Sequence, residues 1–419
     1  HAINHHSRTV VVSHAGRMEI AANEGGYTND HAAAFIEAVH SRKAVNGLTH
    51  TFHRYPARFS PLFARAAVEM FTQPGEVVLD PFMGGGTTLI EACSLGRRAV
   101  GTDISSLATF TTTVKTTPLS EDDFERINHW ASQSEDRLNL RNSPMRATEW
   151  IEQGYQNNIS GKNTWPIRKT LELALASLEE LSSEKQQNFV RCALLGTAQW
   201  ALDSRKEIPS AKEFRKRLLV HLAFMEQGAR KFSAALEGLL QGPLEATCLN
   251  RSVIGIEDDP QVADNPPKLI LTSPPYPGVH AIYHRWQVQG RKETPAPFWI
   301  ANTLDGQGGA FYTFGDRRQQ NLTGYYKQLR ASFNSLAHVA DRETMLIQMV
   351  AFSDPSWQLH KYLEVMEEAN FTEVESPFST RSPDGRLWRY VPNRKWYADQ
   401  RGSTASSKEV VLFHRLART

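Results

Sequence analysis

Cysteine is scarce in this chain of 419 residues: there are three, Cys93, Cys192 and Cys248, and none forms a C-x-x-C pair. This spacing argues against a disulfide framework and a zinc site, and it fits a reducing cytosol. None of the three follows a proline, so the sequence offers no candidate thiol nucleophile. No apolar run approaches the roughly 18 residues that a membrane-spanning helix needs. We therefore expect a cytoplasmic protein with no membrane partner and no metal site.

Neither sign of charge dominates the composition. The formal net charge is +2 at pH 7, and 22% of the residues are charged. This small positive net charge is compatible with nucleic-acid binding through a local basic patch, but it is no evidence for such binding. The length predicts two or three domains with enough chain for a large core.

The most informative stretch is Thr272-Ser273-Pro274-Pro275-Tyr276. It follows the continuous apolar run 269–271, which is typical of a buried parallel strand. Two prolines end the strand and stiffen the turn, because neither has an N–H group. Open α/β sheets place their chemistry at such strand ends. The loop carbonyls and the flat face of Tyr276 are therefore candidates for contact with a ligand amino group, and the alternative is a plain turn with a core tyrosine.

A second informative stretch is a glycine-rich turn. Residues 76–80 predict a strand, 81–88 a tight turn, 89–95 a helix and 98–103 a second, parallel strand. Three adjacent glycines let the backbone approach a ligand, and Asp103 is placed to accept hydrogen bonds from a ribose. The spacing is neither G-x-G-x-x-G nor G-K-[ST], so a nucleoside without a pyrophosphate fits better. The alternative is a glycine turn for tight packing, with Asp103 as a helix cap.

The rest of the chain divides into a helical block and a second α/β block. Residues 119–245 show helical periodicity without a strand signal. Further strands are expected at 253–256, 345–350, 371–375 and 409–413, the last at or near a sheet edge, and helices at 321–340 and 356–369. Residues 277–320 carry no clear period, and we expect a long loop there.

Two basic regions are ambiguous. The helical block carries clustered cations that suit either a solvated face or nucleic-acid contact: Lys212, Arg215, Lys216, Arg217, Arg230 and Lys231. Cations alternate with aromatic side chains in 386–390 and 394–397. This alternation suits phosphate and base contacts, and it equally suits an amphipathic hairpin packed on the sheet.

Together, the segment 80–87 and the loop 272–276 resemble the exocyclic amino-methyltransferases of DNA, which act on cytosine N4 or adenine N6. The glycine segment is similar to their cofactor motif I, Asp103 to the acid of motif II, and 53–61 to motif X. The Ser-Pro-Pro-Tyr loop is similar to their catalytic motif IV. A serine in its first position is typical of the cytosine enzymes, and an aspartate of the adenine enzymes.

The resemblance implies a cofactor, S-adenosylmethionine, and a set of site residues. It assigns catalysis to Ser273, Pro274, Pro275 and Tyr276, and cofactor binding to Tyr55, Pro56, Asp80, Phe82, Gly84, Gly86, Thr87, Asp103 and Asn250. The segment before motif IV often holds an acid in this family, whereas this chain has Asn250. His280, His284 and Arg285 follow the loop and are candidates for DNA contact, or ordinary loop residues.

The resemblance also implies a fold: a Rossmann-like, mostly parallel twisted sheet of the class I methyltransferase type with an inserted helical subdomain. The matching parts are about 50–110 and 250–415. We predict a partly ordered arm (1–48), a cofactor-binding half (49–118), a helical insert that is a possible target-recognition region (119–248) and a catalytic half (249–419).

The implied function is site-specific methylation of a flipped base in double-stranded DNA, at cytosine N4 before adenine N6, within restriction-modification. A restriction endonuclease or another defence protein is then a possible partner, and the sequence leaves the oligomeric state open. The nearest rival is an RNA base amino-methyltransferase, since those enzymes look similar in both motifs, although no RNA-binding module is evident. The other is a non-catalytic DNA-binding subunit of a defence complex.

Overall fold

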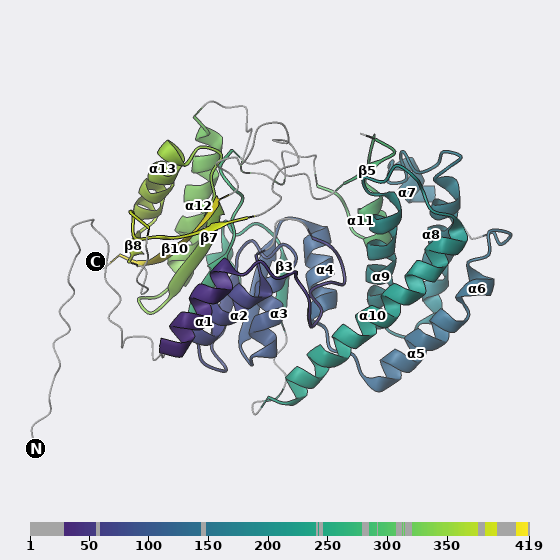
Figure 1. Ribbon diagram of the computed structural model, residues 1–419, viewed down its shortest axis with the longest axis horizontal. Coiled ribbons are helices and arrows are strands. Elements are labelled where there is room, and N and C mark those ends of the chain that lie inside the picture. Colours follow the sequence, from purple (N-terminus) through teal and green to yellow (C-terminus); the bar gives the residue numbers. More distant parts are fainter. Residues whose placement is uncertain are drawn as a thin grey trace, which may run out of the picture.

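The computed structural model describes residues 29–55, 59–143, 148–239, 242, 246–278, 285–290, 292–306, 312, 314, 321–375, 382–391 and 408–417. The chain forms two lobes (Figure 1): an α/β lobe built on a twisted sheet, and a lobe made mainly of helices. The long helix α10 (Ala211–Glu237) runs from the helical lobe to the α/β lobe.

The described residues of the α/β lobe form an eight-stranded sheet in the order β3-β2-β1-β4-β7-β10-β8, with β9 also paired to β10. Strands β3, β2, β1, β4 and β7 pair in parallel, whereas β10 is antiparallel to β7, β8 and β9. The expected Rossmann-like, mostly parallel sheet is confirmed. The strands are β1 (Val77–Asp80), β2 (Arg98–Asp103), β3 (Thr247–Asn250), β4 (Leu269–Thr272), β7 (Met345–Ala351), β8 (Phe371–Val374), β9 (Leu387–Tyr390) and β10 (Lys408–Leu416).

Two expectations about strands are wrong. The last strand, β10, lies inside the sheet between β7 and β8 rather than at or near an edge. The strand expected at 253–256 is absent from that described segment. Gly255 there has φ +80°, a short 3₁₀ turn follows at Ile256–Asp258, and the third parallel strand is β3, a few residues earlier. A glycine in the left-handed region interrupts the extended conformation that a strand needs.

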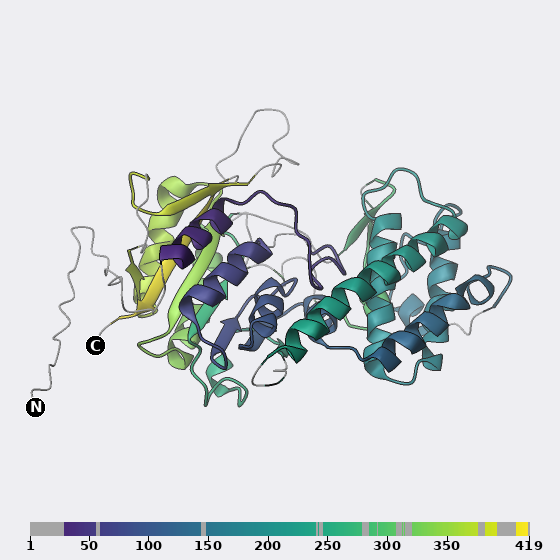
Figure 2. The ribbon, with the colours of Figure 1, turned by 60° about the horizontal axis from the view of Figure 1, so that its bottom comes forward.

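Helices cover both faces of the sheet, as Figure 2 shows. One apolar cluster joins the sheet to α1 (Asn29–His40), α2 (Pro61–Phe71) and α3 (Thr87–Ser94), and another joins it to α12 (Thr323–Val339) and α13 (Pro355–Glu368). Helix α1 lies in the segment expected to be a partly ordered arm. Its Phe35 is fully buried and packs on Phe63 at 5.5 Å between ring centroids.

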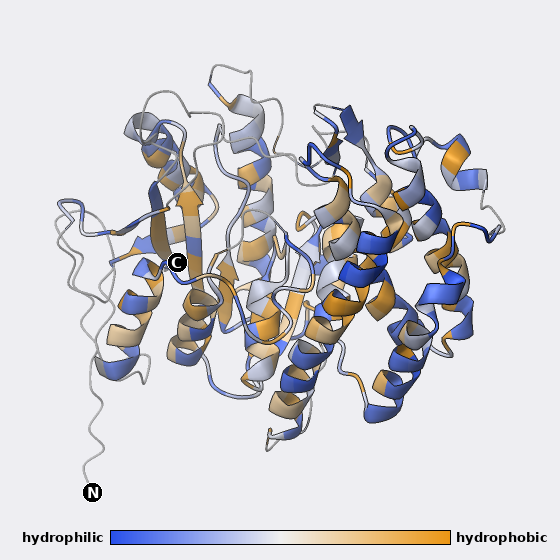
Figure 3. Cartoon of the chain, turned by 45° about the vertical axis from the view of Figure 1, so that its right-hand side comes forward, coloured by the Kyte–Doolittle hydropathy of each residue, from blue (hydrophilic) through white to orange (hydrophobic). Residues whose placement is uncertain are grey.

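The helical lobe has its own apolar core, whose helices carry apolar and polar residues on different sides (Figure 3). It also takes in α4 (Ser106–Thr116) from the α/β lobe, so the two lobes share packed side chains. The other helices are α5 (Glu121–Ser132), α6 (Ser134–Arg137), α7 (Thr148–Glu152), α8 (Trp165–Ser177) and α9 (Glu184–Leu202).

Part of the segment expected to be a loop, 277–320, is structured and belongs to this helical core. It holds a small hairpin, β5 (Trp286–Val288) with β6 (Lys292–Thr294), and the helix α11 (Ala296–Ala301). Trp286 and Phe298 are buried in the helical cluster. The chain therefore leaves the α/β lobe after the Ser-Pro-Pro-Tyr loop and adds three elements to the helical lobe before it returns.

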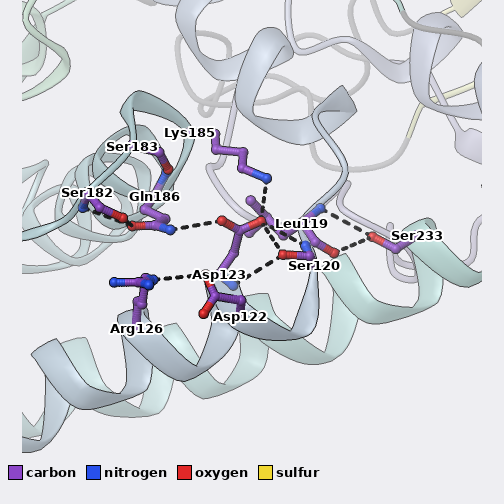
Figure 4. A network of polar contacts seen from close by, with 10 residues as sticks. All are labelled: Leu119, Ser120, Asp122, Asp123, Arg126, Ser182, Ser183, Lys185, Gln186 and Ser233. Atoms are coloured by element: carbon purple, nitrogen blue, oxygen red, sulfur yellow. Dashed lines mark hydrogen bonds and ion pairs between the residues drawn. The ribbon is translucent and has the colours of Figure 1, made fainter.

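Helices α5 and α9 are tied together by Asp123, which Figure 4 shows at the centre of a polar network. Its carboxylate accepts hydrogen bonds from the Ser120 backbone and hydroxyl, at 2.8 Å each, and from Gln186 at 2.8 Å, and it pairs with Lys185. Burial opposes ionisation of Asp123, but the bonds from Lys185, Gln186 and Ser120 lower the pKa of its carboxyl to about 2. Across the described part of the chain, no helix is long and apolar enough to cross a membrane.

Candidate active site

The loop of Ser273, Pro274, Pro275 and Tyr276 leaves the carboxyl end of β4, whose four residues are all buried. Strand β4 lies in the middle of the sheet, between β1 and β7. The continuous apolar run thus forms the buried parallel strand that was predicted. In such sheets, ligands bind beyond the carboxyl ends of the strands.

The backbone carbonyls of this loop differ in their partners. The Tyr325 hydroxyl of α12 donates to the Pro275 carbonyl at 2.7 Å, and the Ser353 N–H donates to the Pro277 carbonyl at 3.3 Å. Burial raises the pKa of the Tyr325 phenol well above its usual range, which keeps it a neutral donor. Among the described residues, no hydrogen bond ends on the Pro274 carbonyl, although Pro274 is buried. Backbone carbonyls in a protein interior usually accept a hydrogen bond, so an oxygen without a described protein donor can accept one from a ligand.

The side chains of the loop bond to each other and to the neighbouring strands. The Ser273 hydroxyl lies 2.9 Å from the Tyr276 hydroxyl and donates to the Met349 carbonyl of β7 at 2.9 Å. The Tyr276 hydroxyl in turn donates to Glu409 of β10, also at 2.9 Å. The loop is therefore held at both its ends by the sheet, as a preorganised site requires.

Asp80 ends β1 and joins the glycine turn to this loop. It is buried and accepts hydrogen bonds from Thr88 and Thr272 at 2.7 Å each, and from the Phe82 N–H at 3.1 Å. Burial raises the pKa of the Asp80 carboxyl to about 6, against the opposing effect of these donors. Both carboxylate oxygens of Asp80 thus accept from protein donors, which connects the glycine turn to the loop.

The glycine turn follows Asp80, and three neighbours fix its shape. Gly84 and Gly86 have φ of +46° and +80°, which other residues adopt with strain. A Cβ on Gly85 would lie 2.9 Å from the Tyr55 Cβ, so Tyr55 packs directly on the turn. From α4, the buried Lys115 ammonium donates to the Gly85 carbonyl at 2.8 Å. The segments that resemble motif X and motif I, distant in sequence, thus meet in space.

Asp103 lies at the end of β2, beside the turn. Its carboxylate accepts from the Gly84 N–H at 3.0 Å and from the Ser105 N–H at 2.8 Å, and the residue remains partly exposed. Desolvation raises the pKa of this carboxyl to about 6. Asn250, its register partner on the neighbouring strand β3, is exposed and donates to the Asp103 backbone carbonyl at 3.0 Å. The structure therefore brings Asp103 and Asn250 together on the edge of the turn.

These residues fit the cofactor that the resemblance implies. The turn lets the backbone approach a ligand, α3 begins after Gly86 with no side-chain cap on its first N–H groups, and Asp103 presents a carboxylate beside them. Thr87, the first residue of α3, is buried, and Phe82 packs on Phe314 at 5.5 Å. Pro56, His280 and His284, also named from the sequence, lie outside the described residues.

Other sequence candidates have partners within the protein. Arg285 forms an ion pair with Asp305 at 2.7 Å. In the basic and aromatic segment, Arg386 pairs with Glu373 through two bonds, 2.7 and 2.9 Å, and β9 pairs with β10. The described part of this segment therefore forms a strand on the sheet with an internally paired cation. Residues 394–397 lie outside the described chain.

Burial makes the thiols unreactive. It raises the pKa of the Cys93 and Cys192 thiols to about 12, and that of Cys248 above its usual value.

Four residues that position the site were missed in the sequence: Lys115, Tyr325, Arg389 and Glu409. Two of them carry a visible signal. Glu409 directly precedes the apolar run 410–413, and Lys115 is a cation in a helix of threonines and apolar residues. Each is almost fully buried. Their partners are distant in sequence, so the signal marks an unusual residue without naming its contact.

Comparison with known proteins finds matches to the segment that contains the glycine turn. Residues 24–109 match the family model N6_N4_Mtase, described as DNA methylase. The chain is 38% identical over 82 residues to the type II methyltransferase M.MvaI of Kocuria varians, and 34% identical over 65 residues to the type II methyltransferase M.MjaII of Methanocaldococcus jannaschii. These matches cover 19% and 16% of this chain, and 18% and 12% of the relatives' lengths. The expected resemblance to the DNA amino-methyltransferases is confirmed.

Similarity to solved structures is weak. Two structures of the rRNA methyltransferase aviRa from Streptomyces viridochromogenes align with TM-scores of 0.34 and 0.29, at 11% and 12% identity. The alignments cover 89% and 87% of this chain, and 94% and 89% of those chains. Similarity at this level carries no inference about the substrate.

Proposed function

We propose that this chain, whose residues 24–109 match the amino-methyltransferase family of DNA methylases, methylates the exocyclic amino group of a flipped base in double-stranded DNA. The proposed base is cytosine and the proposed position N4. The observation that carries the proposal is the pair of acceptors at the end of β4: the Pro274 carbonyl, which has no donor among the described residues, and the Ser273 hydroxyl beside it.

Those two acceptors suit an amino group. An exocyclic amino nitrogen has two N–H donors, and its lone pair is delocalised into the ring. Hydrogen bonds from it to Ser273 and Pro274 favour a nitrogen whose lone pair is directed at an electrophile. Tyr276, on the same rigid loop, offers a ring face on which an extruded base stacks. Catalysis then consists of positioning and electrostatics, and it needs no covalent intermediate.

The cofactor of this family, S-adenosylmethionine, supplies an electrophilic methyl group. In this chain, Gly84 and Gly86 would let the backbone approach it, with Tyr55, Phe82 and Thr87 around the turn. Asp103 would accept hydrogen bonds from its ribose, with Asn250 beside the adenine. Asp80, which is bonded to Thr88 and Thr272, holds this turn against the catalytic loop.

For the DNA, we propose that the helical lobe contributes target contacts. Lys212, Lys216 and Lys231 of α10 are exposed. At the end of α9, two guanidinium groups lie over the Trp200 ring, those of Arg205 at 4.6 Å and Arg217 at 5.5 Å from its centroid. Exposed cations near aromatic rings suit phosphates and bases. The lobe also receives the hairpin β5–β6 that follows the catalytic loop, which links target contacts to the chemistry.

Adenine N6 is the second candidate, because the matching family model spans both kinds of enzyme. The serine in the first position of the loop favours cytosine. The test is nucleoside mass spectrometry of double-stranded DNA and of RNA after incubation with the protein and methyl-labelled S-adenosylmethionine. Labelled N4-methylcytosine in DNA is the expected result, whereas N6-methyladenine would keep the mechanism and change the base. Label in RNA alone would contradict the proposal, and so would cofactor binding without label across a library of target sequences.

A further inference from the structure

A chain of hydrogen bonds runs from the catalytic loop into the sheet. The Ser273 hydroxyl lies 2.9 Å from the Tyr276 hydroxyl, which lies 2.9 Å from Glu409 Oε1. The other carboxylate oxygen of Glu409 accepts from Arg389 Nε at 2.7 Å and pairs with Arg389 Nη2 at 2.6 Å. Glu409 and Arg389 are directly opposite each other on β10 and β9, where facing side chains contact one another.

Because this pair is buried, each of its two charges needs the opposite charge beside it. Glu409 is 2% exposed, and the Arg389 side chain is 12% exposed. A carboxylate that is removed from water is stabilised by a guanidinium with two N–H groups directed at it. In this series of hydrogen bonds, Glu409 is therefore an ionised carboxylate, which only accepts hydrogen bonds.

This acceptor fixes the direction of every bond that follows. The Tyr276 hydroxyl has one proton, and the Glu409 carboxylate takes it. The Tyr276 oxygen is then an acceptor for the Ser273 hydroxyl, and the Met349 carbonyl is a second acceptor for the same proton. Ser273 must donate inward, which leaves its oxygen lone pairs directed away from these two partners. A serine in this state accepts hydrogen bonds from a ligand.

We propose that Glu409, clamped by Arg389, is a positioning residue for methyl transfer: through Tyr276 it holds Ser273 as an acceptor for the amino group and holds the Tyr276 ring in its stacking orientation. This inference rests on the proposed function and deepens it. Glu409 does not touch the base or the cofactor. Its effect reaches the reacting nitrogen only through the hydroxyls of Tyr276 and Ser273.

Substitution of Glu409 by glutamine tests which group donates and which accepts in each of these hydrogen bonds. The guanidinium of Arg389 only donates, so the new amide turns its oxygen to Arg389 and its NH₂ group to Tyr276. The Tyr276 hydroxyl then donates to Ser273 and occupies one of its lone pairs. We expect Glu409→Gln to lower kcat by at least about tenfold, with the Kd for S-adenosylmethionine unchanged within about twofold.

The matched control is Glu373→Gln. Glu373 also forms a two-bonded ion pair with an arginine, Arg386, on the same sheet, and it faces β10 opposite His414. The hydrogen bonds described for its carboxylate come from Arg386, not from the catalytic loop. A loss of kcat in Glu409→Gln that exceeds the loss in Glu373→Gln supports the inference, and equal losses would overturn it.

A double-mutant cycle separates positioning from a general structural role. Tyr276→Phe removes the hydroxyl through which Glu409 reaches Ser273. In that background, Glu409→Gln should lower kcat no further, so the two effects should be strongly non-additive. Additive effects on kcat would contradict the inference, because a purely structural glutamate would have the same cost with or without the Tyr276 hydroxyl.

A second readout needs no activity. In protein labelled with ¹³C at the tyrosine Cζ, slow exchange of a hydroxyl proton gives two Cζ signals in mixed H₂O and D₂O, and Tyr276→Phe assigns them. We expect slow exchange for Tyr276 in the natural chain and faster exchange in Glu409→Gln. Fast exchange in the natural chain would overturn the inference. If the natural chain methylates neither DNA nor RNA, the proposed function fails, and this measurement alone decides whether the hydrogen-bond chain exists.

Discussion

The hydroxyl of Thr272 donates a 2.7 Å hydrogen bond to the carboxylate of Asp80, although the two residues are 192 positions apart. Asp80 ends β1 and Thr272 ends β4, and these strands are neighbours in the sheet. The bond therefore connects the glycine turn to the Ser-Pro-Pro-Tyr loop at their common base. Two motifs that are separated in sequence by helices α4 to α10 are thus joined by a buried contact.

Loss of this contact should destabilise the protein in a way that depends on pH. Thr272→Val leaves a buried carboxylate with one donor fewer, which costs about 1–3 kcal/mol of unfolding free energy at pH 8. The pKa of Asp80 is about 6, so at pH 5 the carboxyl is mostly protonated and the cost should shrink. Urea denaturation at both pH values measures this, with Thr272→Ser as the control that keeps the hydroxyl. Equal costs at both pH values would show that Asp80 is not the group concerned.

Cofactor affinity should fall in mild acid because of Asp103. Desolvation raises the pKa of this carboxyl to about 6, and a ribose hydroxyl donates best to its ionised form. The affinity should be constant above pH 7 and should decrease by about tenfold for each pH unit below 6. Calorimetric titration of S-adenosylmethionine from pH 5 to 8 tests this. Asp103→Asn should bind weakly with no such slope, and an unchanged slope in that variant would assign the titration to another group.

The glycine turn should tolerate no side chain at Gly86. Its φ is +80°, and a Cβ would lie 2.7 Å from Thr112 Cγ2. Gly47 is the matched control, since its φ is +84° and a Cβ there meets nothing within 4 Å. Gly47→Ala should lower the free energy of unfolding by about 1–2 kcal/mol, because alanine must then adopt a left-handed conformation. Gly86→Ala should cost more and should weaken cofactor binding. Equal unfolding free energies for the two variants would show that the Thr112 contact is unimportant.

The helical lobe should depend on Asp123. The pKa of its carboxyl is about 2 in the folded protein and 3.8 when unperturbed, so its stabilisation is complete above pH 4 and disappears as the pH falls towards 2. Asp123→Ala should lower the unfolding free energy at pH 7 by about 2 kcal/mol. The neighbouring Asp122, whose ion pair with Arg126 is exposed, is the control, and its replacement by alanine should change stability little. A similar effect of both substitutions would contradict the role of the network.

The predictability of the fold depended on the range of the interactions. The segment 76–103 was predicted as strand, turn, helix and strand because its signals are local: apolar runs, three glycines and a stop at Gly96. Strand β10 was misplaced, because its position between β7 and β8 follows from tertiary pairing that no local pattern encodes. Part of the segment 277–320 was missed for the same reason: Trp286 and Phe298 are ordered by a core that other helices supply.

In the candidate site, too, local features could be predicted from the sequence and long-range contacts could not. Its motifs were visible because Ser-Pro-Pro-Tyr and the three glycines are rare, contiguous strings. The relations between them were not visible, since the Asp80–Thr272 bond and the Tyr276–Glu409 bond join strands that are distant in sequence. Tyr55 was named from its motif, yet only the structure shows that it packs on the glycine turn. The roles of these residues in binding and transfer remain predictions.

The most direct test of the account is single-turnover methyl transfer by Tyr276→Ala, measured beside its affinity for S-adenosylmethionine. In the proposed function, Tyr276 stacks on the flipped base, whereas Asp103 and the glycine turn bind the cofactor. The proposed function therefore predicts a transfer rate reduced by at least about a hundredfold, with the cofactor Kd unchanged within about twofold. Transfer at the normal rate would contradict the central claim that the loop at the end of β4 holds the base.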